Sequence, residues 1–288
     1  MTAQYNMMCT TAQGRSCPNG HDKKQATSWL RSAQTHERKK EKFFVREYKI
    51  KFGGKSMRKI GIIGAMDEEV SRLKEMMKNV SVIEKAGMDF YIGQLKEKEV
   101  VIVKSGIGKV NAGICTQILI DQYQIEAVIN TGVAGSLKNE INIGDIVLST
   151  DTLYHDMDAT GFGYKLGVIP RMETSIFQAD TILLELAKKV CKEVNKDIQV
   201  FCGRVLSGDQ FISNQNVKER LIKNFSGYCT EMEGAAIAHT AYLNKIPFLI
   251  IRAISDKADS SATMDYGIFE EKAIEHTVNL LLGMIEKL

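Results

Sequence analysis

Short apolar runs alternate with amphipathic segments along the chain from residue 59 onward. The apolar runs are rich in Val and Ile, as strands buried on both faces are. They predict strands at residues 60–64, 100–103, 127–130, 145–149, 198–206 and 248–253. Between them, apolar residues recur three and four positions apart, which is the spacing of one helix face. This predicts helices at residues 67–77, 109–123, 181–194, 217–225, 234–243 and 268–285.

Strands that alternate with helices predict an α/β fold in which helices cover both faces of the sheet. Several of the predicted strands end in glycine or in small polar residues. The predicted strand at residues 127–130 is followed by Thr131-Gly-Val-Ala-Gly135, which we expect to be a turn. In open α/β sheets, ligands bind beyond the carboxyl ends of the strands, so any site is expected there.

The first 56 residues differ from the rest of the chain. They carry 12 Lys and Arg against 4 Asp and Glu, whereas the remaining residues carry 26 against 31. They also show little apolar periodicity. We therefore expect residues 1–57 to be a disordered basic extension and residues 58–288 to be the folded domain. Gly53-Gly54 lies shortly before Met57, where purine-rich glycine codons would form a ribosome-binding site. The hypothesis is that residues 1–56 are translated upstream sequence and Met57 is the true start; the alternative is a genuine basic arm.

Composition excludes several classes of protein. An apolar fraction of 44% is that of a globular protein, and no run of about 18 apolar residues predicts a membrane span. The acidic body would repel backbone phosphates, so we expect no nucleic-acid partner. Six widely spaced cysteines without a C-x-x-C pair indicate reduced thiols and a cytoplasmic protein. No metal site is expected, because the histidines lack ligand spacing.

Three acidic clusters, at residues 66–69, 231–236 and 252–256, are expected to lie at the carboxyl ends of strands. Each has an ordinary explanation: the first could cap a helix, Glu231 and Glu233 could be solvated turn residues, and Asp256 could cap the turn that follows its strand. A carboxylate beyond a buried strand is nevertheless costly to desolvate without a partner or a task. Together the clusters predict a site built from carboxylates. The turn at residues 105–109 lacks the third glycine of a dinucleotide fingerprint, so no NAD cofactor is expected.

Six motifs together resemble one family, the bacterial 5′-methylthioadenosine/S-adenosylhomocysteine nucleosidases of the nucleoside phosphorylase superfamily. They are GIIGAMDEE (61–69), KSGIGKV (104–110), NTGVAG (130–135), SGDQFI (207–212), EMEG (231–234) and RAISD (252–256). Their order and spacing match over residues 58–288. The resemblance implies a single-domain three-layer sandwich with a mixed central sheet flanked by helices. It also implies hydrolysis of an N-ribosidic bond to adenine and a thioribose, in methionine salvage, without a cofactor.

The resemblance also implies roles for the acidic residues. The transition state carries positive charge on the sugar and negative charge entering the purine, so it needs an acid, a directed water and carboxylates near the sugar. Asp256 would protonate purine N7, with its pKa raised by burial. Glu69 would hold the attacking water. Glu233 would bind the ribose hydroxyls, with Met232 packed on the sugar and Glu231 beside it.

The remaining roles implied by the resemblance concern the base and the 5′ substituent. Phe211 would stack on adenine, and the backbone of Ile212 would read its edge. Arg252 and Ser255 would position the acid and the pocket. The 5′-thio group would be enclosed by residues of this chain and of a partner subunit in a homodimer: Met66, Ile107, Tyr266 and the partner subunit's Phe162. Val133 departs from the family, which often has Ser there, so Asp256 must be oriented by other donors.

Three alternatives stay open. A purine nucleoside phosphorylase would need cationic donors for phosphate, whereas residues 67–69 are three carboxylates that would repel it. A futalosine-type hydrolase shares the water-using chemistry. A catalytically silent adenosine-binding protein would keep the pocket without cleaving the bond. The sequence does not rank methylthioadenosine, S-adenosylhomocysteine and 5′-deoxyadenosine as substrates.

Overall fold

The computed structural model describes residues 59–288, apart from the side chains of Thr263 and residues 265–268. The predicted basic extension and the hypothesis about Met57 lie outside these residues. Within them the strands form one mixed sheet, in the order β10-β6-β8-β9-β5-β1-β4-β3-β2, with β7 paired to β6. The strands are β1 (Lys59–Gly64), β2 (Lys78–Lys85), β3 (Met88–Leu95), β4 (Lys98–Lys104), β5 (Ala127–Ser136), β6 (Ile146–Tyr154), β7 (Phe177–Gln178), β8 (Val200–Ser207), β9 (Cys229–Glu231) and β10 (Phe248–Asp256).

The centre of the sheet is parallel. Strand β1 pairs with β4 and β5, and β5 pairs with β10, all in parallel. Strand β10 also pairs with β6 in antiparallel orientation, so that β10, β6, β8, β9 and β5 close into a ring. The predicted mixed α/β architecture is confirmed, and the ring is a feature that the sequence pattern does not predict. At the carboxyl end of β5, Gly135 pairs with Thr230 of β9 on one side and with Asp256 of β10 on the other.

Strands β5 and β10 are both longer than predicted. The prediction of a turn at residues 131–135 is wrong, because β5 continues through these residues to Ser136. Positions 132 and 135 of this strand require glycine because a Cβ atom at either would collide with polar side chains of the site. Strand β10 continues through Asp256, which is its last residue. The backbone of Asp256 pairs with Gly135 of β5, and this pairing fixes the position from which the carboxyl group projects.

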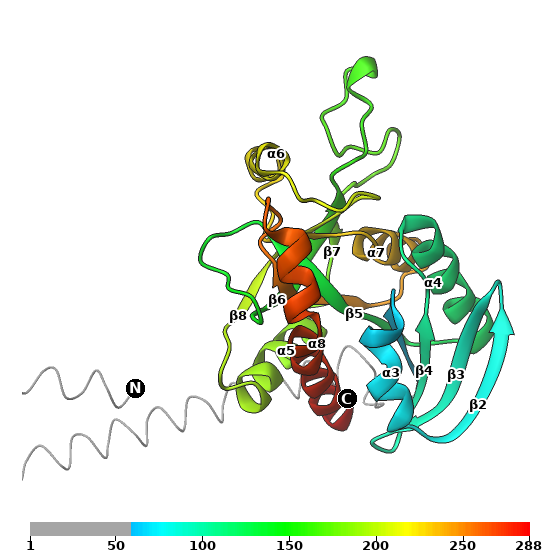
Figure 1. Cartoon of the computed structure of the whole chain (residues 1–288). Helices are drawn as coiled ribbons and strands as arrows, with labels where there is room; N and C mark the ends of the chain where they lie inside the picture. Colours follow the sequence, from blue (N-terminus) through cyan, green and yellow to red (C-terminus); the bar gives the residue numbers. More distant parts are fainter. Residues whose placement is uncertain (1–58) are drawn as a thin grey trace, which may run out of the picture. The chain divides into compact units, whose positions relative to one another are not determined.

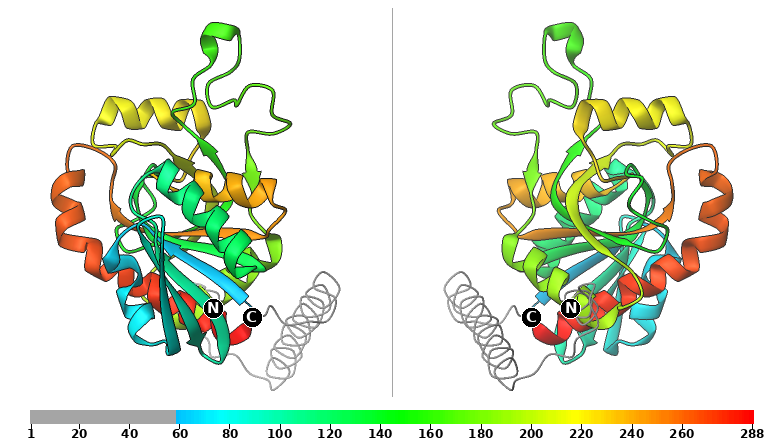
Figure 2. Two further views of the ribbon diagram at one scale, coloured as in Figure 1. Left: turned by 90° about the vertical axis from the view of Figure 1, so that its right-hand side faces the viewer. Right: turned by 90° about the vertical axis from the view of Figure 1, so that its left-hand side faces the viewer.

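Helices cover both faces of the sheet (Figures 1 and 2). They are α3 (Asp67–Glu75), α4 (Lys109–Tyr123), α5 (Thr181–Val194), α6 (Gln215–Phe225), α7 (Gly234–Leu243) and α8 (Ala262–Lys287). Helix α8 packs on α5 and α3, whereas α4 packs on α7. The segment between β6 and β7, with a short 3-10 helix at Thr160–Phe162, extends away from the sheet (Figure 2). No helix among the described residues is long and apolar enough to span a membrane.

The hairpin of β2 and β3 has no counterpart among the predicted strands. All eight residues of β2 are exposed, and β2 lies at the edge of the sheet. An edge strand without a buried face has no alternation of apolar and polar residues for the sequence pattern to reveal. The short strands β7 and β9 were not predicted either, and the other boundaries differ from the prediction by up to six residues.

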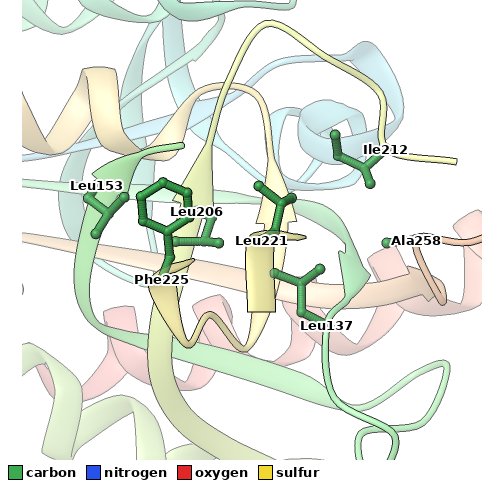
Figure 3. Packing of buried hydrophobic residues seen from close by; sticks show 7 residues of the cluster. All are labelled: Leu137, Leu153, Leu206, Ile212, Leu221, Phe225 and Ala258. Atoms are coloured by element: carbon green, nitrogen blue, oxygen red, sulfur yellow. The ribbon is translucent and has the colours of Figure 1, made fainter. Parts of the chain in front are cut away.

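A cluster of buried apolar side chains fixes α6 against the loops beside the site (Figure 3). It consists of Leu137, Leu153, Leu206, Ile212, Leu221, Phe225 and Ala258. Leu221 and Phe225 come from α6, whereas Ile212 and Ala258 come from the loops that follow β8 and β10. Burial of each Leu, Ile or Phe side chain contributes about 1.5–3 kcal/mol, so these two loops are fixed relative to each other.

Candidate active site

A cavity of about 380 Å³ opens beyond the carboxyl ends of β1, β5, β9 and β10. Twelve of the fourteen site residues predicted from the sequence line it: Met66, Glu69, Ile107, Val133, Phe211, Ile212, Glu231, Met232, Glu233, Arg252, Ser255 and Asp256. The cavity is also lined by Ala65, Ala134, Gly135, Gln210 and Thr230, which the sequence analysis did not select. The structure thus brings the six motifs together around one space.

Of the two remaining predicted site residues, Phe162 does not line this cavity. Phe162 lies in the 3-10 helix of the projecting segment, with 88% of its surface exposed. This exposure leaves the side chain available to a partner subunit, which is the prediction made for it. The side chain of Tyr266 lies outside the described residues, so its role stays a prediction.

Arg252 is the central cation of the site. It stands on β10 and is 1% exposed. Its Nη2 atom donates to Glu231 and to Asn130 Oδ1, the latter at 2.6 Å, and lies 3.4 Å from Glu233 Oε2. Its Nη1 atom donates to the Val133 carbonyl at 3.3 Å and lies 4.0 Å from Glu69 Oε1. One planar guanidinium therefore joins three carboxylates that come from two motifs.

Glu69 has two functions in the structure. Its Oε2 atom accepts hydrogen bonds from the backbone N–H groups of Ala65, at 2.6 Å, and Met66, at 3.1 Å, and so caps helix α3. Its Oε1 atom accepts from Val133 N–H at 3.1 Å and borders the cavity. Burial raises the pKa of the Glu69 carboxyl, and the Arg252 guanidinium opposes this effect. The capping explanation and the site explanation thus both apply.

Glu231 is held by donors on both of its oxygen atoms. Oε1 accepts from the Ser207 hydroxyl, and Oε2 accepts from Glu233 N–H at 3.0 Å, from Gly234 N–H at 2.7 Å and from Arg252. The two backbone donors lie at the start of α7. This arrangement occupies the acceptors of Glu231 and fixes the guanidinium of Arg252.

Glu233 faces the cavity with its carboxylate held from two sides. Gly108 N–H donates to Oε1 at 2.9 Å, and Arg252 lies near Oε2. Gly108 has φ +99°, a conformation that favours glycine, and this points its N–H group at the carboxylate. Burial raises the pKa of Glu233, with the neighbouring Glu231 adding to the effect and Arg252 opposing it.

Asp256 ends β10 and is 2% exposed. Ser255 Oγ donates to its Oδ2 atom at 2.9 Å, and Ala258 N–H donates to its Oδ1 atom at 2.7 Å. Donors other than a hydroxyl at position 133 therefore orient this carboxyl group. A Cβ atom at Gly135 would lie 2.7 Å from Asp256 Oδ1, so only glycine leaves this carboxyl in place.

Apolar side chains and one orphaned hydroxyl complete the lining. Phe211 is half exposed at the opening, whereas Ile212 is buried. Thr230 lies in β9 opposite Gly135, and its buried hydroxyl has no hydrogen-bond partner within residues 59–288. The described residues contain no group of three His, Cys, Asp or Glu side chains that could hold a metal ion. The site therefore offers carboxylates, one guanidinium and an apolar wall.

Comparison with known proteins identifies the family of this chain. Residues 59–286 match the Phosphorylase superfamily. The 5′-methylthioadenosine/S-adenosylhomocysteine nucleosidase of Halalkalibacterium halodurans is 44% identical over 233 residues, which are 81% of this chain and 100% of that protein. The crystal structure of such a nucleosidase from Colwellia psychrerythraea 34H in complex with adenine has a TM-score of 0.78 at 39% identity, over 81% of this chain and 96% of the other.

A related hydrolase is also similar to the chain. The structure of futalosine hydrolase of Helicobacter pylori strain 26695 has a TM-score of 0.77 at 33% identity, over 81% of this chain and 99% of the other. The identity to the Halalkalibacterium nucleosidase is higher and extends over that protein's whole length. The chain therefore belongs to the 5′-methylthioadenosine/S-adenosylhomocysteine nucleosidases, N-glycosidase hydrolases of the Phosphorylase superfamily.

Proposed function

We propose that this chain hydrolyses the N-ribosidic bond of 5′-methylthioadenosine and S-adenosylhomocysteine, with 5′-deoxyadenosine as a further substrate. The products are adenine and the corresponding ribose derivative, as expected of an enzyme of methionine salvage in the cytoplasm. The observation that carries the proposal is the convergence of Glu69, Glu233 and Asp256 on one cavity beside a single buried guanidinium.

Asp256 acts as the general acid at the purine. It donates a proton to N7, so that adenine leaves as a neutral molecule and not as an anion. Negative charge then develops on the Asp256 carboxyl. The Ser255 hydroxyl and the Ala258 N–H group stabilise that charge, because both already donate to the two carboxyl oxygens.

Glu69 holds and polarises the attacking water. The backbone donors at Ala65, Met66 and Val133 fix its carboxylate at the wall of the cavity. Its raised pKa makes the carboxylate a better proton acceptor than an ordinary glutamate. Phosphate would be repelled by Glu69 and Glu233 together, which favours hydrolysis over phosphorolysis.

Glu233 binds the ribose hydroxyls and stabilises the cationic sugar. Its carboxylate borders the cavity between the donors Gly108 and Arg252. Glu231, with both oxygens already hydrogen-bonded, keeps Arg252 in position. The two glutamates of one motif therefore have different functions: Glu233 contacts the sugar, and Glu231 fixes the cation behind it.

The apolar wall binds the two ends of the substrate. Phe211 stacks on adenine, and the Ile212 backbone, adjacent in the loop, reads the edge of the base. Met232 packs on the sugar. Met66, Ile107 and Tyr266 enclose the 5′-thio substituent. An apolar enclosure suits a thioether and disfavours a charged 5′ group, because burying an unpaired charge is costly.

A homodimer would complete this enclosure with the partner subunit's Phe162. Four apolar side chains are exposed on the paired helices α4 and α7: Val110, Ile114, Tyr242 and Leu243. Exposed apolar side chains on adjoining helices indicate an interaction surface. Phe162, on the projecting segment, is exposed as well. Sedimentation equilibrium of the chain tests the dimer, and Phe162→Ala should raise KM for methylthioadenosine.

Futalosine hydrolysis is the second candidate, because the Helicobacter hydrolase has a similar structure. The test incubates purified protein separately with methylthioadenosine, S-adenosylhomocysteine and futalosine, with and without phosphate, and measures the free base. We expect adenine release that phosphate does not accelerate. Phosphate-dependent release would indicate a phosphorylase, a preference for futalosine would favour the second candidate, and no release would indicate a silent binding protein.

A further inference from the structure

A buried lysine lies beside the proposed acid and has no part in the steps described above. Lys218 stands in the first turn of α6 and is only 4% exposed. A cation in the first turn of a helix opposes the helix dipole, and an ammonium ion is costly to bury unless it is paired. Its position therefore requires compensating interactions.

The Lys218 ammonium group makes two such interactions with the loop that follows Asp256. Its Nζ atom donates to the Lys257 carbonyl oxygen at 2.5 Å and lies 3.6 Å from Asp259 Oδ2. The Lys257 carbonyl belongs to the same peptide group as the Ala258 N–H, which donates to Asp256 Oδ1 at 2.7 Å. One peptide group therefore connects the ammonium ion to the carboxyl group.

We propose that Lys218 is a positioning residue for the general acid and acts through this peptide group. The inference rests on the proposed function of Asp256. As the proton leaves for the purine, the Asp256 carboxyl becomes negative. A cation on the carbonyl oxygen polarises the amide and makes its N–H a stronger donor to that charge. It also holds the peptide plane, so that the donor needs no reorganisation during the reaction.

The apolar cluster of Figure 3 fixes the helix that carries Lys218. Leu221 and Phe225 of α6 pack in one cluster with Ala258, whose N–H group donates to the acid. Ile212, in the loop proposed to read the base, belongs to the same cluster. Helix α6 therefore fixes the base-reading loop and the loop after the acid together, and Lys218 joins α6 to the second of these loops.

The test compares two substrates with Lys218→Met, which keeps an apolar side chain of similar length and removes the cation. Adenine in methylthioadenosine needs protonation to leave, whereas p-nitrophenolate in p-nitrophenyl 5-methylthioriboside leaves as an anion. We expect kcat to fall about tenfold or more for methylthioadenosine and to stay within about threefold for the nitrophenyl riboside. Lys218→Arg, which keeps a cationic donor, should recover most of the lost activity.

Two further variants serve as controls. Asp259→Asn keeps the hydrogen bond from Lys218 to Lys257 and should change either rate by no more than about threefold. Asp256→Asn should show the same selective loss as Lys218→Met, only larger. If Lys218→Met does not fold by circular dichroism, Lys218→Gln replaces it in the same comparison.

The outcomes distinguish failure of the role proposed for Lys218 from failure of the role proposed for Asp256. Equal losses on both substrates, unchanged turnover of methylthioadenosine, or an equal selective loss in Asp259→Asn would overturn the role of Lys218. An Asp256→Asn variant that keeps normal turnover would instead refute the proposed function of Asp256, whatever the lysine variants do.

Discussion

Arg252 and Glu233 form a buried ion pair in the cavity, with Nη2 3.4 Å from Oε2. The same guanidinium also contacts Glu69 and Glu231. When all three glutamates are ionised, this group of four side chains carries a net negative charge in a site shielded from water. Such a charge is suited to a sugar that becomes cationic in the transition state, and it is unfavourable for a phosphate nucleophile.

Arg252 stabilises the fold and also organises the site. Removing one partner of a buried ion pair typically costs about 3–5 kcal/mol, because it leaves charges unpaired. We expect Arg252→Met to lower the free energy of unfolding by at least this amount, as measured by urea titration. Arg252→Lys should recover little, since an ammonium ion lacks the planar fork that reaches several acceptors. The exposed Arg72→Met is the control, and a stable Arg252→Met variant would contradict this account.

Gly135 determines whether Asp256 can occupy its place. A Cβ atom there would lie 2.7 Å from Asp256 Oδ1 and 2.8 Å from Ala258 Cβ. We expect Gly135→Ala to reduce kcat for methylthioadenosine by about a hundredfold, the scale of a general-acid contribution. In Gly113→Ala the added Cβ would make only an ordinary contact of 3.7 Å with Thr240, so this variant serves as the control. Equal activity of the two variants would remove the steric argument.

The acid limb of the pH profile follows from the buried glutamates. Burial raises the pKa of Glu69 and of Glu233 above the ordinary glutamate value. Both carboxylates must be ionised to polarise water and to stabilise the cationic sugar. As pH falls through the raised pKa values they become protonated, so kcat/KM should decrease at a higher pH than an ordinary glutamate would cause. A profile that stays flat down to pH ~4.5 would contradict this assignment.

Single-residue variants test the division of labour between Asp256 and Glu69. We expect Asp256→Asn and Glu69→Gln each to reduce adenine release by at least about a hundredfold. Asn has no proton of suitable acidity to donate, and Gln is a poor acceptor for a proton of water. The exposed Glu286→Gln should match the unaltered chain. Near-normal turnover in either site variant would remove that residue from its role.

The centre of the fold follows from the sequence because buried parallel strands are continuous apolar runs, such as Ile60–Ile63 and Phe248–Ile251. The hairpin at residues 78–95 was missed, since its outer strand is exposed along its whole length. The path of β5 through Thr131–Gly135 was wrongly predicted to be a turn. Two glycines suggest a turn locally, whereas here they make room for Arg252, Glu69 and Asp256.

The site residues were predicted mainly from the resemblance of six motifs to a known family and less from the local pattern of apolar and polar residues. The residues that line the cavity are up to 191 positions apart, from Ala65 to Asp256, and only the sheet brings them together. Arg252 was expected to position the pocket, but its contact with three glutamates could not be read from spacing. Thr230 and Lys218 were missed because the function of a buried polar side chain depends on its neighbours in space, not in sequence.

The most direct test is a crystal structure of the chain with a non-hydrolysable methylthioadenosine analogue. We expect an Asp256 oxygen within about 3 Å of purine N7, Glu233 at a similar distance from the ribose hydroxyls, and a water molecule between Glu69 and the anomeric carbon. A purine bound outside this cavity, or with N7 facing away from Asp256, would contradict the account.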